Sequence, residues 1–152
     1  MAIAISLHLL AAVLWVGGMF FAYIVLRPIA ATLLEPPVRL TLWAQVFKRF
    51  FPWVWMAIII LLASGLWMVF AHFGGFSAVG IHVHTMIVLA VIMIVIFAHV
   101  YYGPYRHLHA AVATENWPAG GAKLNQIRKL IGINLILGLV IVVIASAGRY
   151  FS

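Results

Sequence analysis

The sequence contains no cysteine and almost no acidic residues. Its 152 residues include two Asp+Glu and no Cys, so disulfide bonds, thiolate metal sites and cysteine nucleophiles are excluded. Paired carboxylates for acid–base work, or a nucleophile beside a base, are not found, so hydrolysis and phosphoryl transfer have no support. Any metal chemistry therefore falls to histidine, methionine or the two carboxylates.

Charged residues of both signs are scarce as well. They make up 7% of the chain, and 67% is hydrophobic, whereas soluble domains keep about 25% charged residues. With a mean hydropathy of +1.20, this composition indicates an integral membrane protein in contact with a lipid bilayer. The net charge of +7 comes from a few basic residues without acidic partners, which argues against nucleic acid as a partner.

Four apolar runs are separated by proline, glycine and polar residues. A membrane span needs about 20 mainly apolar residues, and a backbone inside the bilayer must satisfy its own hydrogen bonds. We therefore predict an all-α fold, an integral-membrane up-down four-helix bundle forming a single domain over 1–152. The predicted helices cover about 2–26, 52–73, 81–102 and 127–148.

The basic residues indicate an orientation for this bundle. Of the nine Lys+Arg, four follow the first predicted helix, four follow the third, and Arg149 alone follows the fourth. By the positive-inside rule the two basic connections are cytoplasmic. We therefore expect a multi-pass protein with both termini and the 74–80 turn on the outer side, which in the inner (cytoplasmic) membrane of a Gram-negative bacterium is the periplasmic side.

Histidines gather toward the expected outer side. Because ionisable side chains are costly in a span, they normally face the bundle interior. His82 and His84 are about 200° apart on a helix and cannot both face inward. His84 and His99 share one stripe with Val88, Val91 and Val95, and we predict that this stripe faces inward. In the 52–73 helix the matching stripe is Ser64, Met68 and His72, and in the last helix it is Asn134, Gly138, Ile141 and Ala145.

Several of these residues could equally have an ordinary structural role instead of binding a ligand. His72 and His82 lie near the membrane boundary, where a solvated histidine is ordinary, and they are weaker candidates than His8 and His84. Ser64 and Asn134 are more often interhelical hydrogen-bond partners than ligands.

The first helix carries the run His8-Leu9-Leu10, then Trp15-Val16-Gly17-Gly18, then Leu26-Arg27-Pro28. This run resembles the copper-resistance D (CopD) family of bacterial inner-membrane proteins, as do Lys48-Arg49-Phe50 and Ser64-Gly65. The spacing of His8, Trp15 and Gly18 also resembles the membrane protoporphyrinogen oxidases that carry haem b. His84 stands where that second family has a lysine, which argues against its enzymatic activity. The two resemblances imply that His8 serves copper or haem.

Haem b is the leading cofactor expected from the residues. A b-type haem needs two histidines across the porphyrin, and His8 and His84 lie on diagonal helices of an up-down bundle. Gly18 provides space for the ring, and Arg149 could pair with the propionates. The expected function is electron transfer, or membrane oxidoreductase activity, between a donor such as quinol and a periplasmic redox partner.

Two alternatives remain open. Copper binding or uptake would use His8 and His84, with His72, His82 and His99 as further metal candidates and Met68 or Met86 as soft donors. The third alternative is a structural or partner subunit of a membrane complex.

Overall fold

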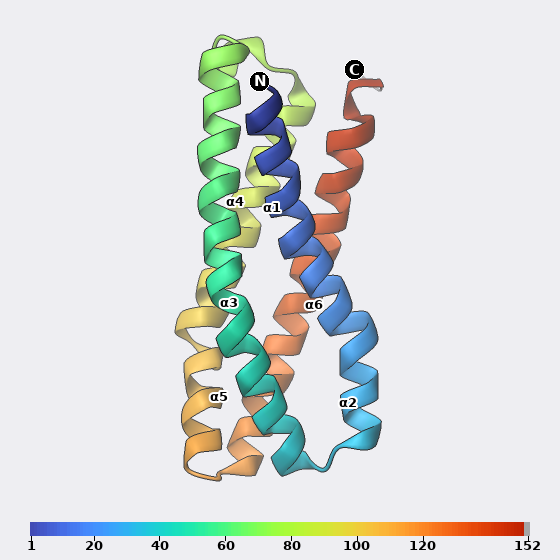
Figure 1. The fold of residues 1–152 in the computed structure, drawn as a ribbon, viewed down its shortest axis with the longest axis vertical. Coiled ribbons are helices and arrows are strands. Elements are labelled where there is room, and N and C mark those ends of the chain that lie inside the picture. The colour runs from blue at the N-terminus through green and yellow to red at the C-terminus, as the bar shows by residue number, and fades with distance from the viewer. Residues whose placement is uncertain (151–152) are drawn as a thin grey trace.

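The computed structural model describes residues 1–150, except for the side chain of Arg149. Its chain forms four helical rods joined by short turns (Figure 1). The first rod consists of α1 (Ala2–Phe20), the π-helical η1 (Phe21–Leu26) and α2 (Arg27–Leu33). The second consists of α3 (Pro36–Trp67) and η2 (Met68–His72). After η3 (Phe76–Ala78) come α4 (Ile81–Tyr102) with α5 (Pro104–Ala113), and then α6 (Trp117–Ala147) with η4 (Gly148–Tyr150).

Each rod is long and apolar enough to cross a membrane. The rods contain 32, 37, 33 and 31 residues, which at 1.5 Å per residue is about 45–55 Å. A bilayer core is about 30 Å thick, so every rod is longer than its span. All regular structure in residues 1–150 is helical, and the predicted four-helix membrane fold is confirmed.

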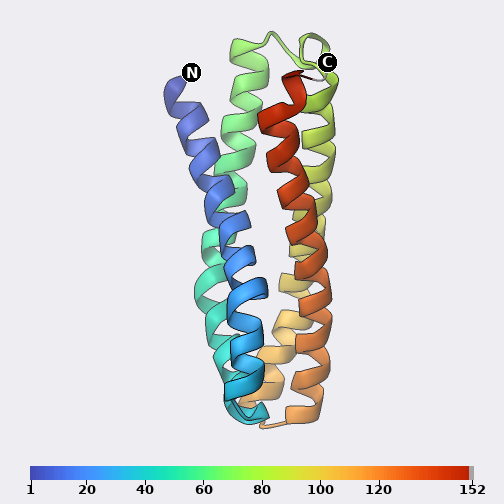
Figure 2. The same ribbon diagram turned by 90° about the vertical axis from the view of Figure 1, so that its right-hand side faces the viewer.

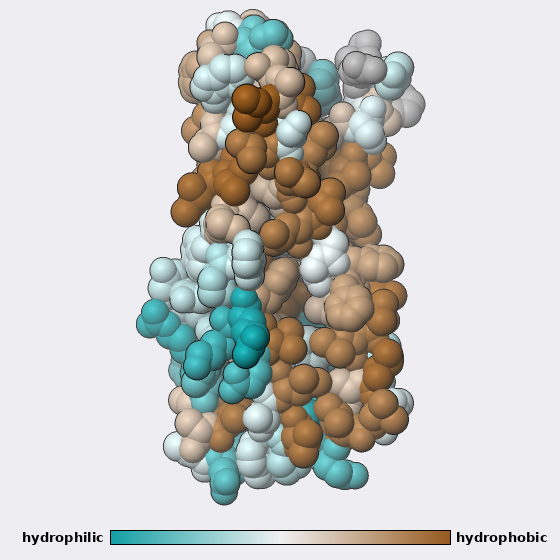
Figure 3. All heavy atoms as spheres, viewed as in Figure 1, coloured by the Kyte–Doolittle hydropathy of each residue, from teal (hydrophilic) through white to brown (hydrophobic). Residues whose placement is uncertain are grey.

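The two ends of the bundle differ in content. The start of α1, the 73–80 turn and the end of α6 lie at one end, which we call the terminal end. The turns at 34–35 and 114–116 lie at the other, which we call the basic end. Figure 3 shows hydrophilic side chains gathered over α3 and α5 in this half, while hydrophobic atoms cover most of the remaining face.

The extra length comes from segments that the sequence suggested were polar connections. α2, the first turns of α3, all of α5 and the start of α6 are helical, although they carry most of the basic residues. Prolines lie in the first turns of α3, α5 and α6, where their missing N–H costs nothing. The Asn116 side chain also caps α6 by accepting a hydrogen bond of 3.3 Å from the Ala119 N–H.

Aromatic side chains hold the middle of the bundle together. Phe51 stacks on Phe47 at 5.0 Å between ring centroids and meets Phe97 edge-on at 5.2 Å. Trp15 of α1 meets the same Phe97 at 6.2 Å. These contacts join α1, α3 and α4 through one buried layer.

Packing loosens toward the terminal end. There α1 packs mainly on α3, and α4 mainly on α6 (Figure 2). In α1 the buried residues begin at Ala11, and in α4 they begin at Met93. The terminal end is therefore built from two helix pairs rather than from one closed core.

The longest helix, α3, changes direction near its middle (Figure 1). Pro52 lies inside it. Proline has no N–H to donate to the carbonyl of Lys48, and its ring crowds that carbonyl, so a bend is expected there.

Candidate functional site

His8 lies on the buried side of α1, one turn before Ala11. Its Nδ1 atom is 2.8 Å from the Ser64 Oγ on α3. The Ser64 hydroxyl donates its hydrogen to the Ile60 carbonyl of its own helix, so it accepts a hydrogen bond from His8. We therefore infer that His8 carries its proton on Nδ1, which would leave the lone pair of Nε2 for a ligand.

The approach of α1 to α3 at this point depends on Gly65. A Cβ atom at Gly65 would lie 3.3 Å from His8 Cε1, so a larger residue would press on the imidazole. Met68 is one helical turn beyond Ser64 and is half-buried. This helix pair therefore brings an oriented imidazole and a thioether to the same region.

His82 lies between the start of α4 and the end of α6. A Cβ at Gly80 would be 2.8 Å from its Nδ1, and a Cβ at Gly148 would be 2.8 Å from its Cβ. The two glycines thus make room for the ring. Its Nδ1 atom is buried and has no hydrogen-bond partner within residues 1–150, which is unusual for a buried polar atom. Met86 follows one turn later on α4.

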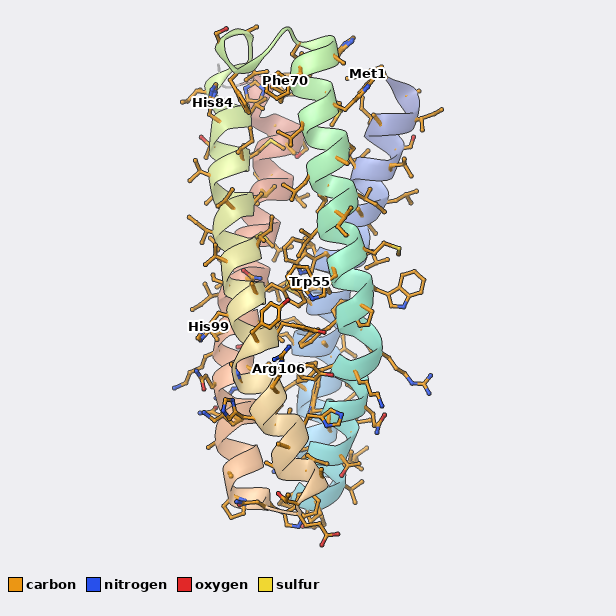
Figure 4. All side chains as sticks on the ribbon, turned by 90° about the vertical axis from the view of Figure 1, so that its left-hand side faces the viewer. Met1, Trp55, Phe70, His84, His99 and Arg106 are labelled. Carbon is orange, nitrogen blue, oxygen red and sulfur yellow. The ribbon has the colours of Figure 1, made fainter. Side chains whose placement is uncertain are left out.

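His84 lies on another side of α4, beside the 73–80 turn (Figure 4). Its Nδ1 atom is 3.3 Å from the Gly80 carbonyl, and its ring centroid is 6.5 Å from that of Phe76. A ligand role for His84 stays a prediction.

The prediction that the stripe from His84 to His99 faces inward is wrong. Val88, Val91 and Val95 are 58%, 51% and 62% exposed, and His99 is exposed too (Figure 4). The inward residues of α4 are instead Met93, Phe97 and Val100. α4 is apolar on all sides, and valine suits lipid as well as a core, so its sequence holds no signal for its phase.

The stripes predicted for the other helices fit the structure better. Ser64 is buried and Met68 half-buried, although His72 is exposed. On the last helix Asn134 and Gly138 are buried, Ile141 packs against the core, and Ala145 is exposed. The Asn134 amide donates a hydrogen bond of 3.1 Å to the Met93 carbonyl, which is the interhelical role considered for it.

The remaining candidates are dispersed. Trp15 is buried in the aromatic layer, and Gly18 lies against the Phe50 ring, so both serve helix packing. A cofactor role for either stays a prediction, and the Arg149 side chain lies outside the described residues. Among those described, no three His, Cys, Asp or Glu side chains come together as a metal-binding group.

Sequence reasoning missed one feature, a cavity at the basic end lined by Arg27, Arg39 and Arg128. In the sequence these arginines indicate the orientation of the chain, and Arg27 is also part of the family resemblance of the first helix, but neither observation predicts a cavity. The sequence feature that could have indicated this cavity is that the chain has only two acidic residues to pair with its arginines.

Comparison with known proteins gives the family. The model of the copper resistance protein D family matches residues 44–147, which include the Lys48-Arg49-Phe50 and Ser64-Gly65 segments. No curated protein and no solved structure matches the chain. Four rods able to cross a bilayer and a match over most of the sequence lead to one conclusion: the chain is a multi-pass membrane protein that belongs to the copper resistance protein D family.

Proposed function

We propose that the chain binds copper at the terminal end of its bundle, as part of copper handling in a bacterial cytoplasmic membrane. The observation that carries this proposal is the family match over residues 44–147. It favours the copper alternative over haem b, the cofactor first expected.

The donor atoms at the terminal end suit copper(I). This ion prefers thioether and imidazole ligands when no thiolate is present. His8 presents Nε2, and the buried Nδ1 atom of His82 has no hydrogen-bond partner in the part of the chain that the structure describes. Met68 lies one turn from Ser64, so the pair α1 and α3 supplies the imidazole of His8 and one thioether. Met86 lies one turn from His82, so the pair α4 and α6 supplies an imidazole and a thioether as well.

The sidedness of the bundle supports delivery from outside the cell. The basic end carries eight of the nine Lys+Arg, and the positive-inside rule assigns such an end to the cytoplasm. The histidine-bearing terminal end would then face the periplasm. Uptake would also require the ion to pass the aromatic layer, where Met19 and Met93 are the buried thioethers.

Haem b has lost its geometric support. Two axial histidines must face each other across the porphyrin, and the pairing of His8 with His84 relied on an inward stripe that faces outward. Electron transfer with a quinol or a periplasmic partner therefore has no observation in its favour. Metal analysis and the optical spectrum of the purified chain test haem b together with copper.

The test is copper binding by the purified full chain under reducing conditions. Wild type should retain stoichiometric copper against a copper(I) chelator, and the His8→Ala/His82→Ala variant should bind more than about tenfold more weakly, because each helix pair loses its imidazole. The matched control is His107→Ala/His109→Ala, which removes two exposed histidines of α5 and should retain copper.

Two results would overturn the proposal. Equal loss in both double variants would mean adventitious binding to surface histidines. Iron with a pyridine-haemochrome spectrum, and no copper, would restore the haem b interpretation.

A further inference from the structure

A cavity of about 340 Å³ lies in the basic half of the bundle, where η1 and α2 face the first turns of α3 and α6. None of its lining residues is a histidine, so it is separate from the proposed copper site. Its charged lining residues are Arg27, Arg39 and Arg128, one from each of α2, α3 and α6. The two carboxylates of the chain, Glu35 and Glu115, do not line it.

Two of these arginines are held in place by the backbone. The Arg27 Nε donates a hydrogen bond of 3.2 Å to the Tyr23 carbonyl, and its guanidinium carbon lies 4.3 Å from the centroid of the Tyr23 ring. The Arg39 Nη1 donates to the Ala31 carbonyl at 3.3 Å. A guanidinium has five N–H donors, so each of these bonds leaves most of the donors for a ligand.

The residues around the cavity indicate that it lies at the level of a membrane interface. Arg27 directly follows the apolar run of the first rod, and Arg128 is at the start of the apolar run of the last. Trp43 and Trp117 also line the cavity, and tryptophan is typical of the boundary between hydrocarbon and headgroups. Just before Arg27, η1 exposes the apolar side chains of Phe21, Ile24 and Val25.

We propose that this cavity binds the headgroup of an anionic phospholipid from the leaflet that meets the basic end. Arginine binds phosphate oxygens through paired hydrogen bonds, and basic pockets between membrane helices suit anionic headgroups. The volume is at the low end for small-ligand sites, so it fits a headgroup while the acyl chains remain in the bilayer. The exposed apolar surface of η1 favours a lipid over a soluble phosphate, which could not use it.

The test counts lipid bound to the purified full chain by native mass spectrometry. Phosphatidylglycerol and phosphatidylcholine with the same acyl chains are titrated separately. Wild type should prefer the anionic lipid about tenfold, and Arg27→Gln/Arg128→Gln should abolish this preference. Arg49→Gln/Arg106→Gln loses the same charge at exposed positions outside the cavity and should keep it.

A second variant fills the cavity without changing the charge. Gly121 lines it, and a Cβ there meets nothing within 4 Å, so Gly121→Leu should fold and still lose the preference. Gly17→Leu is its control, because a Cβ at Gly17 also meets nothing within 4 Å and Gly17 is not in the cavity.

Three results would overturn the proposal. The first is equal binding of both lipids by wild type. The second is an equal loss of preference in the two double arginine variants, which would mean unspecific attraction to surface charge. The third comes from a competition experiment: displacement of the lipid by equal concentrations of inorganic phosphate or glycerol phosphate would mean that the site serves a soluble anion.

Discussion

The Ser64 hydroxyl illustrates how a single polar atom can order a membrane site. It donates to a carbonyl of its own helix and accepts from His8 of another helix. One side chain thereby fixes the tautomer of the imidazole and ties α1 to α3. In a bilayer such a contact cannot be replaced by water, although its net contribution is modest because an unfolded chain also finds partners.

Ser64→Ala should lower the free energy of unfolding by about 0.6 kcal/mol, and by no more than about 1.7 kcal/mol. The loss arises because His8 Nδ1 is left without its acceptor. Unfolding in mixed micelles of mild detergent and dodecyl sulfate measures it. Ser146→Ala is the control, since the Ser146 hydroxyl bonds only to carbonyls of its own helix and its loss should change stability by less than about 0.5 kcal/mol. Equal effects would contradict the link between helices.

At the scale of elements, α6 is held close to two other helices at Gly138. A Cβ there would lie 2.9 Å from Val16 Cγ2 of α1 and 3.3 Å from Met93 Cε of α4. Valine is stiff because its Cβ is branched, so it cannot easily turn aside. The small residue is therefore required for α1, α4 and α6 to meet.

Gly138→Ala should destabilise the bundle by about 1–3 kcal/mol through overpacking. The matched change Gly17→Ala, in an open position of α1, should be neutral or stabilising by up to about 1 kcal/mol, because alanine favours helix. Thermal unfolding in detergent compares the two. If both alanines stabilise the protein, the contact at Gly138 is not tight.

Sequence patterns predicted where the helices lie in the chain better than they predicted which side of each helix is buried. The four spans follow from apolar length, and the buried faces of α3 and α6 follow from Ser64 and Asn134, which stand out against apolar neighbours. Between Ile81 and Val100, α4 offered only Thr85 and its histidines as polar residues, and the stripe chosen from His84 and His99 faces outward. The helical extensions were also missed, because charged residues near a membrane boundary are typical of loops and of exposed helices alike.

At the scale of the whole molecule, the start of α1, the 73–80 turn and the end of α6 share one end. This arrangement agrees with an even number of crossings, and the charge distribution assigns a direction to it. In the proposed orientation, the histidine-bearing end would be accessible from outside the cell and the arginine-lined cavity from the inner leaflet.

Single cysteines test this direction against a native background that has none. Ser77→Cys should react with a membrane-impermeant maleimide in intact cells, because it lies in the turn at the terminal end. Thr114→Cys, an exposed residue at the basic end, should react only after the inner membrane is opened. The reverse pattern would invert the orientation and move the proposed copper site to the cytoplasm.

The bend at Pro52 has a mechanical consequence. It divides α3 into two levers joined at a hinge, because a proline leaves the helix without one of its backbone ties. The upper lever, on the side of the terminal end, carries Ser64, and the lower lever, on the side of the basic end, carries Arg39 and Trp43. We expect a tilt imposed on the lower lever, as when the proposed headgroup enters the cavity, to be absorbed at the hinge, so that the imidazole end keeps its alignment while the basic end adjusts to its leaflet.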